Sequence, residues 1–298
     1  MSQIPELQLL TWNIDAFSES HDLRMEGILS EVRRMVSHDS GPDIVFFQEV
    51  SREALAYLLR NHWVRETWIL SEVDETNWAN VSFATVTLLS RFRFGSALNK
   101  SGRQPEVNTS SISVPNDGVF SLGPVWRVKY PSRYGRDALC CDILWNKATS
   151  RIRLINVHLD SLRIEPSKRP RQAAIAASLL RTAGVGRGVI AGDWNPVLDE
   201  DKDLVQANGL VDAWEYLHPE ENGFTWGLDG KRSPLPPTRL DKVAILGLTI
   251  VDIRVVHPGT VTKVMDAGLK EGVGQGRVKV PWSDHSGLVC RFSLEGAS

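Results

Sequence analysis

Short runs of apolar residues recur along the whole chain, and most have the length of a β-strand and end at turn-forming residues. The predicted strands are 7–12, 44–47, 81–89, 138–145, 151–157, 188–191, 240–246, 250–256 and 288–294. The short polar turn between 138–145 and 151–157 predicts an antiparallel hairpin. We expect 240–246 and 250–256 to pair with each other as well.

Helical periodicity is confined to three segments. Apolar residues recur at helical spacing over 25–36, Ser51 can cap a second helix that runs to residue 59, and 171–183 is rich in Ala and Leu. Helices connect some strands and hairpins connect others. This mixture predicts an α/β (α+β) protein in which sheets pack face to face with helices outside.

Three stretches rich in polar residues, Gly or Pro are expected to be surface loops, namely 92–117, 233–237 and 264–276. None has the length or the composition of an interdomain linker. We therefore expect residues 1–298 to form a single domain. No segment has the pattern of an oligomerisation element, so we expect a monomer.

The composition narrows the class of protein. Of the 298 residues 42% are hydrophobic and 23% charged, which excludes a disordered, collagenous or coiled-coil protein. The 34 Lys and Arg nearly balance the 36 Asp and Glu, so we do not expect general coating of duplex DNA, which needs a basic surplus. Three cysteines without paired spacing favour reduced thiols. With no secretory signal and no apolar run of ~18 residues, we expect an intracellular protein, nuclear or cytoplasmic, with no membrane partner.

Polar residues of the kinds that bind metals and move protons stand next to the predicted strands. They are Asn13, Glu49, His158, Asp193, Asn195, Asp241, Asp284 and His285. Each one alone is explained as a turn former or a strand cap. Together they predict a site, because loops just beyond strand ends are where a scaffold presents reactive groups.

The acidic members of this set point to metal and water chemistry. Glu49 and Asp284 are hard oxygen ligands of the kind that suits Mg²⁺. Asp193 can orient or deprotonate a water, and Asn195 can hold that water or a phosphate oxygen. The Cys and multi-His sets that bind zinc are missing from these loops.

The histidines complete the prediction. His158 and His285 can stabilise charge that develops on phosphoryl oxygens, and Asp241 can orient His285. A metal, an activated water and two histidines together predict in-line hydrolysis of a phosphate ester. The sequence has no GxSxG and no GxxxxGK[ST] motif, which disfavours a serine hydrolase and a nucleotide kinase.

Five ordered motifs resemble those of the endonuclease/exonuclease/phosphatase superfamily. They are Thr11-Trp12-Asn13-Ile14-Asp15, Phe47-Gln48-Glu49-Val50, Asn156-Val157-His158-Leu159-Asp160-Ser161, Gly192-Asp193-Trp194-Asn195 and Ser283-Asp284-His285. The resemblance spans residues 7–294. It implies a four-layer α/β/β/α sandwich, DNase I-like, with two mixed β-sheets inside, helices outside and the active site at one edge.

Within that superfamily the chain is most similar to the 5′-tyrosyl-DNA phosphodiesterase branch, through 11–15, 158–163, 224–226 and 239–243. This resemblance implies that Glu49 is the principal Mg²⁺ ligand, supported by Asn13 and Asp284, with Mn²⁺ as a substitute. It makes Asp193 the water-activating group. It implies phosphate and transition-state contacts by Asn195, His158 and His285, and contacts to the nucleic-acid strand by Ser161, Arg163 and Trp226.

The expected function is therefore Mg²⁺-dependent hydrolysis of a phosphoester at a blocked DNA end, with a 5′-phosphotyrosyl linkage as the first candidate. Val197 stands where that branch has a basic residue, and Ser286 stands where it has Trp. These departures keep open a less specific nuclease, a DNA 3′-phosphatase or phosphodiesterase, and a small-molecule phosphatase. The intact polar set argues against a binding scaffold without activity. A local basic patch over 163–171 is expected to contact phosphates.

Overall fold

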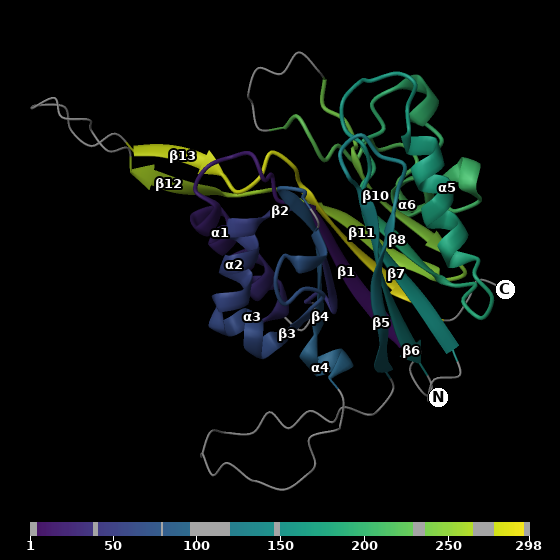
Figure 1. The fold of residues 1–298 in the computed structure, drawn as a ribbon, viewed down its shortest axis with the longest axis horizontal. Coiled ribbons are helices and arrows are strands. Elements are labelled where there is room, and N and C mark those ends of the chain that lie inside the picture. Colours follow the sequence, from purple (N-terminus) through teal and green to yellow (C-terminus); the bar gives the residue numbers. More distant parts are fainter. Residues whose placement is uncertain are drawn as a thin grey trace, which may run out of the picture.

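The computed structural model describes residues 5–37, 41–78, 80–95, 120–145, 150–228, 236–264 and 277–294. Within them, two six-stranded mixed sheets lie face to face. Helices α1, α2 and α3 cover the outer face of one sheet, and α5 covers the outer face of the other (Figure 1). The expected four-layer α/β sandwich is confirmed.

The first sheet has the strand order β11-β14-β1-β2-β4-β3. Its strands are β1 (Glu6–Asn13), β2 (Ile44–Ser51), β3 (Trp68–Leu70), β4 (Phe83–Ser90), β11 (Thr249–Val256) and β14 (Gly287–Ser293). The second sheet has the order β5-β6-β7-β8-β10-β9. Its strands are β5 (Phe120–Lys129), β6 (Asp137–Trp145), β7 (Ser150–His158), β8 (Gly188–Asp193), β9 (Val211–Asp212) and β10 (Asp241–Leu246).

The helices of the described residues are α1 (His21–Val36), α2 (Arg52–Arg60), α3 (His62–Thr67), α4 (Arg91–Phe94), α5 (Arg169–Leu180) and α6 (Ala213–Leu217). Ser51 caps α2, as expected, because its Oγ accepts a hydrogen bond from the amide of Ala54 at 3.2 Å. A separate ribbon of β12 (Thr260–Val264) and β13 (Arg277–Pro281) projects beside α1 (Figure 1). No helix in the described part of the chain has both the length and the apolar character to cross a lipid bilayer.

Three apolar layers hold the sandwich together. The first lies between the sheets, where Phe46 and Phe292 meet Leu154 and Val243. The second joins the first sheet to α1 and α2, and the third joins the second sheet to α5. Burial of side chains of this size contributes about 1.5–3 kcal/mol each, so these layers are the main source of stability.

The predicted hairpin of 138–145 with 151–157 is confirmed as the antiparallel pair β6–β7. The predicted pairing of 240–246 with 250–256 is wrong. β10 pairs with β8 and β9 in one sheet, whereas β11 pairs with β14 in the other. The chain changes sheets at Gly247, whose φ of 64° is in the left-handed region, and Leu248 is buried in the layer between the sheets.

Some strands lack a clear sequence pattern and were not expected. β5 contains Gly123 and Pro124 and is mostly half-exposed, so its alternation is weak. The expected loops at 92–117, 233–237 and 264–276 lie largely outside the described residues, although α4 occupies the start of the first one.

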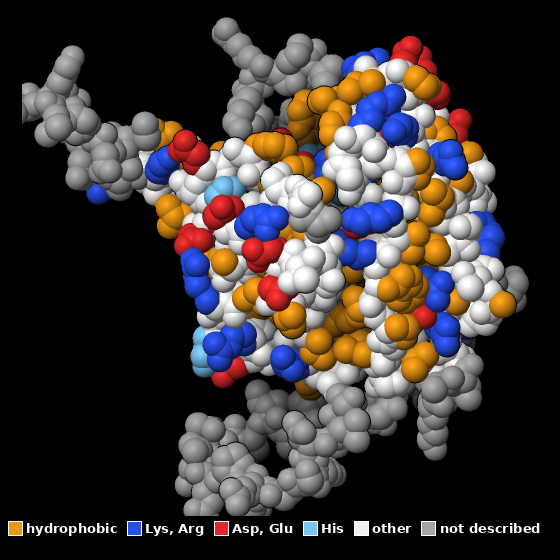
Figure 2. All heavy atoms as spheres, in the orientation of Figure 1, with side chains coloured by type: hydrophobic (Ala, Val, Ile, Leu, Met, Phe, Trp, Pro, Cys, Tyr) orange, Lys and Arg blue, Asp and Glu red, His pale blue; other side chains and the backbone are white. Residues whose placement is uncertain are grey.

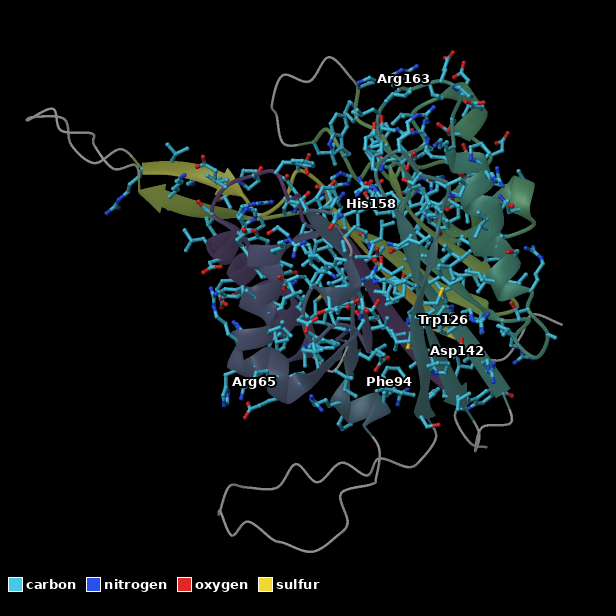
Figure 3. The ribbon with its side chains drawn as sticks, viewed as in Figure 1. Arg65, Phe94, Trp126, Asp142, His158 and Arg163 are labelled. Atoms are coloured by element: carbon cyan, nitrogen blue, oxygen red, sulfur yellow. The ribbon has the colours of Figure 1, made fainter. Side chains whose placement is uncertain are left out.

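Two parallel strand pairs, β1–β2 and β7–β8, direct their carboxyl ends to the same edge of the sandwich. His158 lies toward this edge, on the side of Arg163, while Phe94, Trp126 and Asp142 lie toward the opposite end (Figure 3). The fold therefore brings the polar residues that follow these strands into one region.

Candidate active site

Strand register places three of the predicted residues side by side. His158 and Asp193 are partners across the parallel pair β7–β8, and Asp193 and Asp241 are partners across the antiparallel pair β8–β10. His158 Nε2 lies 3.4 Å from Asp193 Oδ2. Gly192 permits this approach, because its φ is 143° and a Cβ there would lie 1.9 Å from the carbonyl oxygen of Val157.

The first sheet contributes Asn13 at the end of β1 and Glu49 near the end of β2. Asn13 Nδ2 donates to Glu49 Oε1 at 3.3 Å and to Asp193 Oδ2 at 3.0 Å, so one amide joins groups from both sheets. Glu49 sits in a register shift between Phe47 and Val50 and has a φ of 53°. This irregular backbone turns a side chain out of the strand pattern at the site.

The ligand atoms of Glu49, His158 and Asp193 lie within 4.8 Å of one another and could together hold a metal ion. The two carboxylates are hard oxygen donors, which fit Mg²⁺. His158 Nε2 is buried and has no hydrogen-bond partner in the described residues, so it is free to contact a ligand. Oδ2 of Asp284, the other expected carboxylate ligand, accepts a hydrogen bond from Trp226 Nε1 at 3.1 Å.

Burial and neighbouring charge set the protonation of the acidic groups. Burial, together with the negative charge of Asp241, raises the pKa of the Asp193 carboxyl to about 7. Asp193 Oδ1 accepts a hydrogen bond from the amide of Asn195 at 2.9 Å, which fixes its orientation. Burial also raises the pKa of Glu49. Burial thus disfavours the ionised form of both carboxylates, and a positive charge bound between them would stabilise that form.

The two histidines have opposite environments. Burial disfavours a charge on His285, but the attraction of Asp241 and the hydrogen bond between them raise its pKa to about 10. Burial lowers the pKa of His158 well below its ordinary value, and the charges of Arg136 and His285 lower it further. At neutral pH His285 is therefore a cation and His158 is neutral, the kind of separation that assigns different roles to similar groups.

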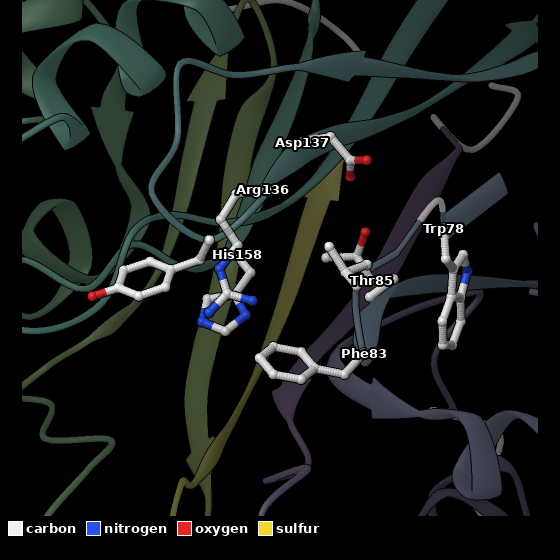
Figure 4. A pocket seen from close by; sticks show the side chains of 10 residues that line it. Trp78, Phe83, Thr85, Arg136, Asp137 and His158 are labelled. Atoms are coloured by element: carbon white, nitrogen blue, oxygen red, sulfur yellow. The ribbon is translucent and has the colours of Figure 1, made fainter.

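Arg136 belongs to the site and was missed by sequence reasoning. It precedes β6 directly, and its guanidinium stacks on Phe83, 4.7 Å from the ring centroid, beside the ring of His158 (Figure 4). The residue is only 9% exposed, and its Nε has no hydrogen-bond partner in the described residues. Burial lowers its pKa, while the charges of Glu49 and Asp193 oppose that change. Its position just before a predicted strand is the signal that could have found it.

A groove opens beside the site and contains all three predicted strand contacts. Its lining includes Ser161, Arg163, Trp226, Asn195, Asp284 and His285. Apolar side chains make much of the rest, with Leu162 exposed and Val197 at the wall. On the face of the molecule drawn in Figure 2, basic side chains are interspersed with acidic and apolar ones.

The expected basic patch over 163–171 is only partly present. Arg169 is 1% exposed, and its guanidinium forms an ion pair with Asp201 at 2.7 Å. A buried paired cation is not available to a phosphate, so Arg169 has a structural role. Arg163 remains exposed at the groove.

The two departures from the sequence motifs lie in different places. Val197 lines the groove, where a basic side chain would face the substrate. Ser286 is 2% exposed, its amide donates to the carbonyl of Thr225 at 2.7 Å, and its Oγ lies 3.0 Å from His257 Nδ1. Only the change at 197 therefore alters the surface of the groove.

No protein-family model matches the sequence, and no curated protein matches it. Solved structures match the fold. Humanized TDP2 of D. rerio gives a TM-score of 0.62 at 18% identity, over 97% of this chain and 99% of the other. D. rerio TDP2 complexed with single-strand DNA product gives 0.60 at 18% identity, over the same shares of the two chains. An endonuclease/exonuclease/phosphatase family protein from Bacteroides thetaiotaomicron gives 0.63 at 13% identity, over 98% and 99%. The chain therefore has the fold of the endonuclease/exonuclease/phosphatase superfamily, and the resemblance drawn from its motifs is confirmed at the level of the fold.

Proposed function

We propose that this chain is a Mg²⁺-dependent phosphodiesterase that hydrolyses a phosphoester at a blocked DNA end, with a 5′-phosphotyrosyl linkage as its first substrate. The observation that carries the proposal is the convergence of Asn13, Glu49, His158 and Asp193 from the ends of four strands. The fold shared with TDP2, including the complex with single-strand DNA product, supports the choice of DNA ends.

In the proposed reaction Asp193 accepts a proton from the attacking water. Its oxygens are fixed by the amide of Asn195 and the side chain of Asn13, and its pKa of about 7 suits a base that works near neutral pH. Mg²⁺ held by Glu49 would neutralise charge on a phosphoryl oxygen and polarise the phosphorus.

Cationic and neutral hydrogen-bond donors surround the position where negative charge would develop on the phosphoryl oxygens. His285 is held as a cation by Asp241, and His158 presents Nε2, which has no hydrogen-bond partner in the part of the chain that the structure describes. Arg136 adds a second cation close enough to lower the pKa of His158. Preorganised donors of this kind stabilise the transition state more than the ground state. The positive charge near the reacting phosphate would then come from His285 and Arg136, so a basic residue at position 197 would not be required.

The groove would hold the strand that carries the ester. Ser161 and Arg163 can contact backbone phosphates, and Trp226 can stack on an unpaired base. Because few cations line the groove, affinity would depend on a few contacts near the end rather than on a long duplex.

A second candidate is a less specific phosphoesterase, acting on 3′-blocked DNA or on a small phosphoester. The observation that favours it is the apolar side chain of Val197 in the groove wall. The catalytic residues would be the same, and the contacts beyond the phosphate would differ.

Oligonucleotides with a 5′-tyrosyl, a 3′-phosphate or an abasic site, together with an inositol phosphate, test the proposal when compared at equal enzyme with Mg²⁺ and with EDTA. We expect the 5′-tyrosyl substrate to be cleaved fastest and EDTA to stop all cleavage. Equal rates on all four substrates would favour the second candidate. Cleavage that survives EDTA would refute both.

A further inference from the structure

The segment 14–18, here called the 14–18 loop, follows the end of β1, lies two residues before α1 and contacts the site. Its amides fix two of the groups proposed to bind the metal. The amide of Asp15 donates to Asn13 Oδ1 at 3.0 Å, and the amide of Ala16 donates to Glu49 Oε2 at 3.0 Å. Glu49 Oε1 is left to face Asn13 and His158.

The shape of the loop depends on hydrogen bonds within it and on contacts from outside it. Asp15 has a φ of 55°, which is unfavourable for a residue with a Cβ, and Phe17 is 78% exposed. Asp15 Oδ1 does accept hydrogen bonds from the amides of Phe17 and Ser18. These bonds shape the turn. The amide of Ile14 donates to the carbonyl of Gln48 at 3.0 Å, and the ring of Phe17 packs edge-on against Phe83 with 5.3 Å between the ring centroids.

Arg24 of α1 ties the backbone carbonyls of the loop to the helix. Its side chain is nearly fully buried, and its guanidinium donates to three backbone carbonyls of the loop, those of Ile14 at 2.7 Å, Asp15 at 2.8 Å and Ser18 at 3.0 Å. It also lies 3.3 Å from Asp15 Oδ2. A planar fork with several fixed donors can bind this set of acceptors together, whereas an ammonium group cannot reproduce its geometry.

We propose that Arg24 is a positioning residue for the metal site. Arg24 fixes the carbonyls of the 14–18 loop, the loop thereby directs the amides of Asp15 and Ala16, and those amides orient Asn13 and Glu49. The inference rests on the proposed function, because it assumes that Glu49 binds the metal. Hydrogen bonds to a ligand's remaining oxygen are known to control metal affinity in this way.

A purely structural role is the rival explanation, since loss of a buried, hydrogen-bonded cation destabilises a protein. The two differ in what changes while the protein is folded. If Arg24 is only structural, replacing it lowers the midpoint of thermal unfolding and leaves the metal affinity of the folded protein unchanged. If Arg24 is a positioning residue, replacing it lowers the metal affinity at temperatures where the variant is fully folded.

The test is calorimetric titration of Mn²⁺ or Mg²⁺ into the substrate-free full-length protein, with folding checked by circular dichroism. The variants are Arg24→Lys, which keeps the charge and loses the fork, and Arg24→Ala. Arg34→Gln is the matched control, because Arg34 lies on the same helix and its side chain is 60% exposed. Adding methylguanidinium to Arg24→Ala tests whether a free fork restores the site.

We expect folded Arg24→Lys to bind the ion about 10–100-fold more weakly than wild type, the usual effect of losing such a supporting contact. Arg34→Gln should bind like wild type, and methylguanidinium should restore part of the affinity of Arg24→Ala. The Mg²⁺ concentration for half-maximal rate should rise more than kcat at saturating Mg²⁺ falls.

Equal ion affinity of wild type and folded Arg24→Lys would overturn the inference and leave the proposed function standing. Failure of the wild-type protein to bind any divalent ion would overturn the proposed function and the inference together.

Discussion

Asp241 and His285, 44 residues apart in the sequence, are joined by a hydrogen bond of 2.8 Å between Oδ2 and Nδ1 in a buried setting. Asp241 begins β10 in the second sheet, and His285 stands just before β14 in the first. The bond therefore links the two sheets at the edge where the candidate active site lies, and it keeps His285 charged.

Replacing Asp241 with Asn should move the alkaline limit of activity to lower pH. The folded-state pKa of His285 is raised from 6.5 to about 10, so its stabilising contribution is complete below pH 6.5 and is lost as the pH rises through about 10. Without the Asp241 charge, the pKa of His285 falls, so its stabilising contribution is lost at a lower pH. The pH profiles of kcat/KM and of the free energy of unfolding measure this shift. Identical alkaline limbs for wild type and Asp241→Asn would contradict it.

Glu49→Gln and Asp193→Asn should each lower kcat by about 10²–10⁴-fold without unfolding the protein, because each keeps the side-chain shape and removes the charge. Rates on the 5′-tyrosyl oligonucleotide and circular dichroism spectra check both points. Glu75→Gln serves as the control, since Glu75 is exposed and paired only with Arg52 in the described residues. Full activity of either active-site variant would exclude the proposed roles.

Arg136→Gln should lower kcat/KM by about 10²–10³-fold, the usual cost of removing one preorganised donor to developing charge. Arg136→Lys should recover part of the loss, because it restores the charge but not the stacking on Phe83. The control is Arg133→Gln, whose parent side chain is exposed in the same loop. Equal losses in the Arg133 and Arg136 variants would argue for a general charge effect.

Trp226 should affect substrate binding more than the chemical step. Trp226→Ala should raise KM by an amount equivalent to about 1–3 kcal/mol if the indole stacks on a base. Trp226→Phe keeps a stacking face and loses the hydrogen bond to Asp284, so it should retain most of the affinity. Measuring KM with single-stranded oligonucleotides separates these effects. A KM unchanged in Trp226→Ala would remove this residue from the binding surface.

Gln48 and Asn156 form a buried polar link between the two sheets, directly behind Glu49 and His158. Gln48 Nε2 donates to Asn156 Oδ1 at 2.8 Å, and Asn156 Nδ2 donates to the carbonyls of Phe47 and Val86. Gln48→Leu should lower the free energy of unfolding by about 1–3 kcal/mol, because it leaves the buried acceptors Asn156 Oδ1 and Thr11 Oγ1 without this donor. Denaturant unfolding measures the loss. Additive effects of Gln48→Leu and Asn156→Leu would show that the two side chains do not interact.

Local sequence pattern predicted much of the fold and selected the candidate residues of the site. The alternation and length of apolar runs encode which residues face the core, so the central strands and α1, α2 and α5 could be read directly. Asp193 and His158 could be selected as candidates because they follow such strands. Trp194, which stands between Asp193 and Asn195, is fully buried in the layer beneath α5.

Strand pairing and the burial of charged side chains could not be predicted from the local sequence pattern. β10 and β11 have similar patterns and are adjacent in sequence, yet they belong to different sheets, because partner choice depends on strands that come from distant parts of the chain. The local sequence indicates a surface cation at Arg169. In the fold its guanidinium is buried and pairs with Asp201, 32 residues later in the chain. Arg136 becomes part of the site only through the fold, which brings Phe83 and His158 close to it.

The sequence by itself determined the elements, the order of the motifs and the kinds of side chain available for chemistry, since these depend on the period of the apolar positions and on residue type. Only the tertiary structure decided which of those side chains meet. Asn13 reaches both Glu49 and Asp193 because two parallel strand pairs in opposing sheets end at one edge, and Arg24 reaches the loop behind them because α1 packs beneath it. Such contacts arise from long-range packing, which no local pattern records.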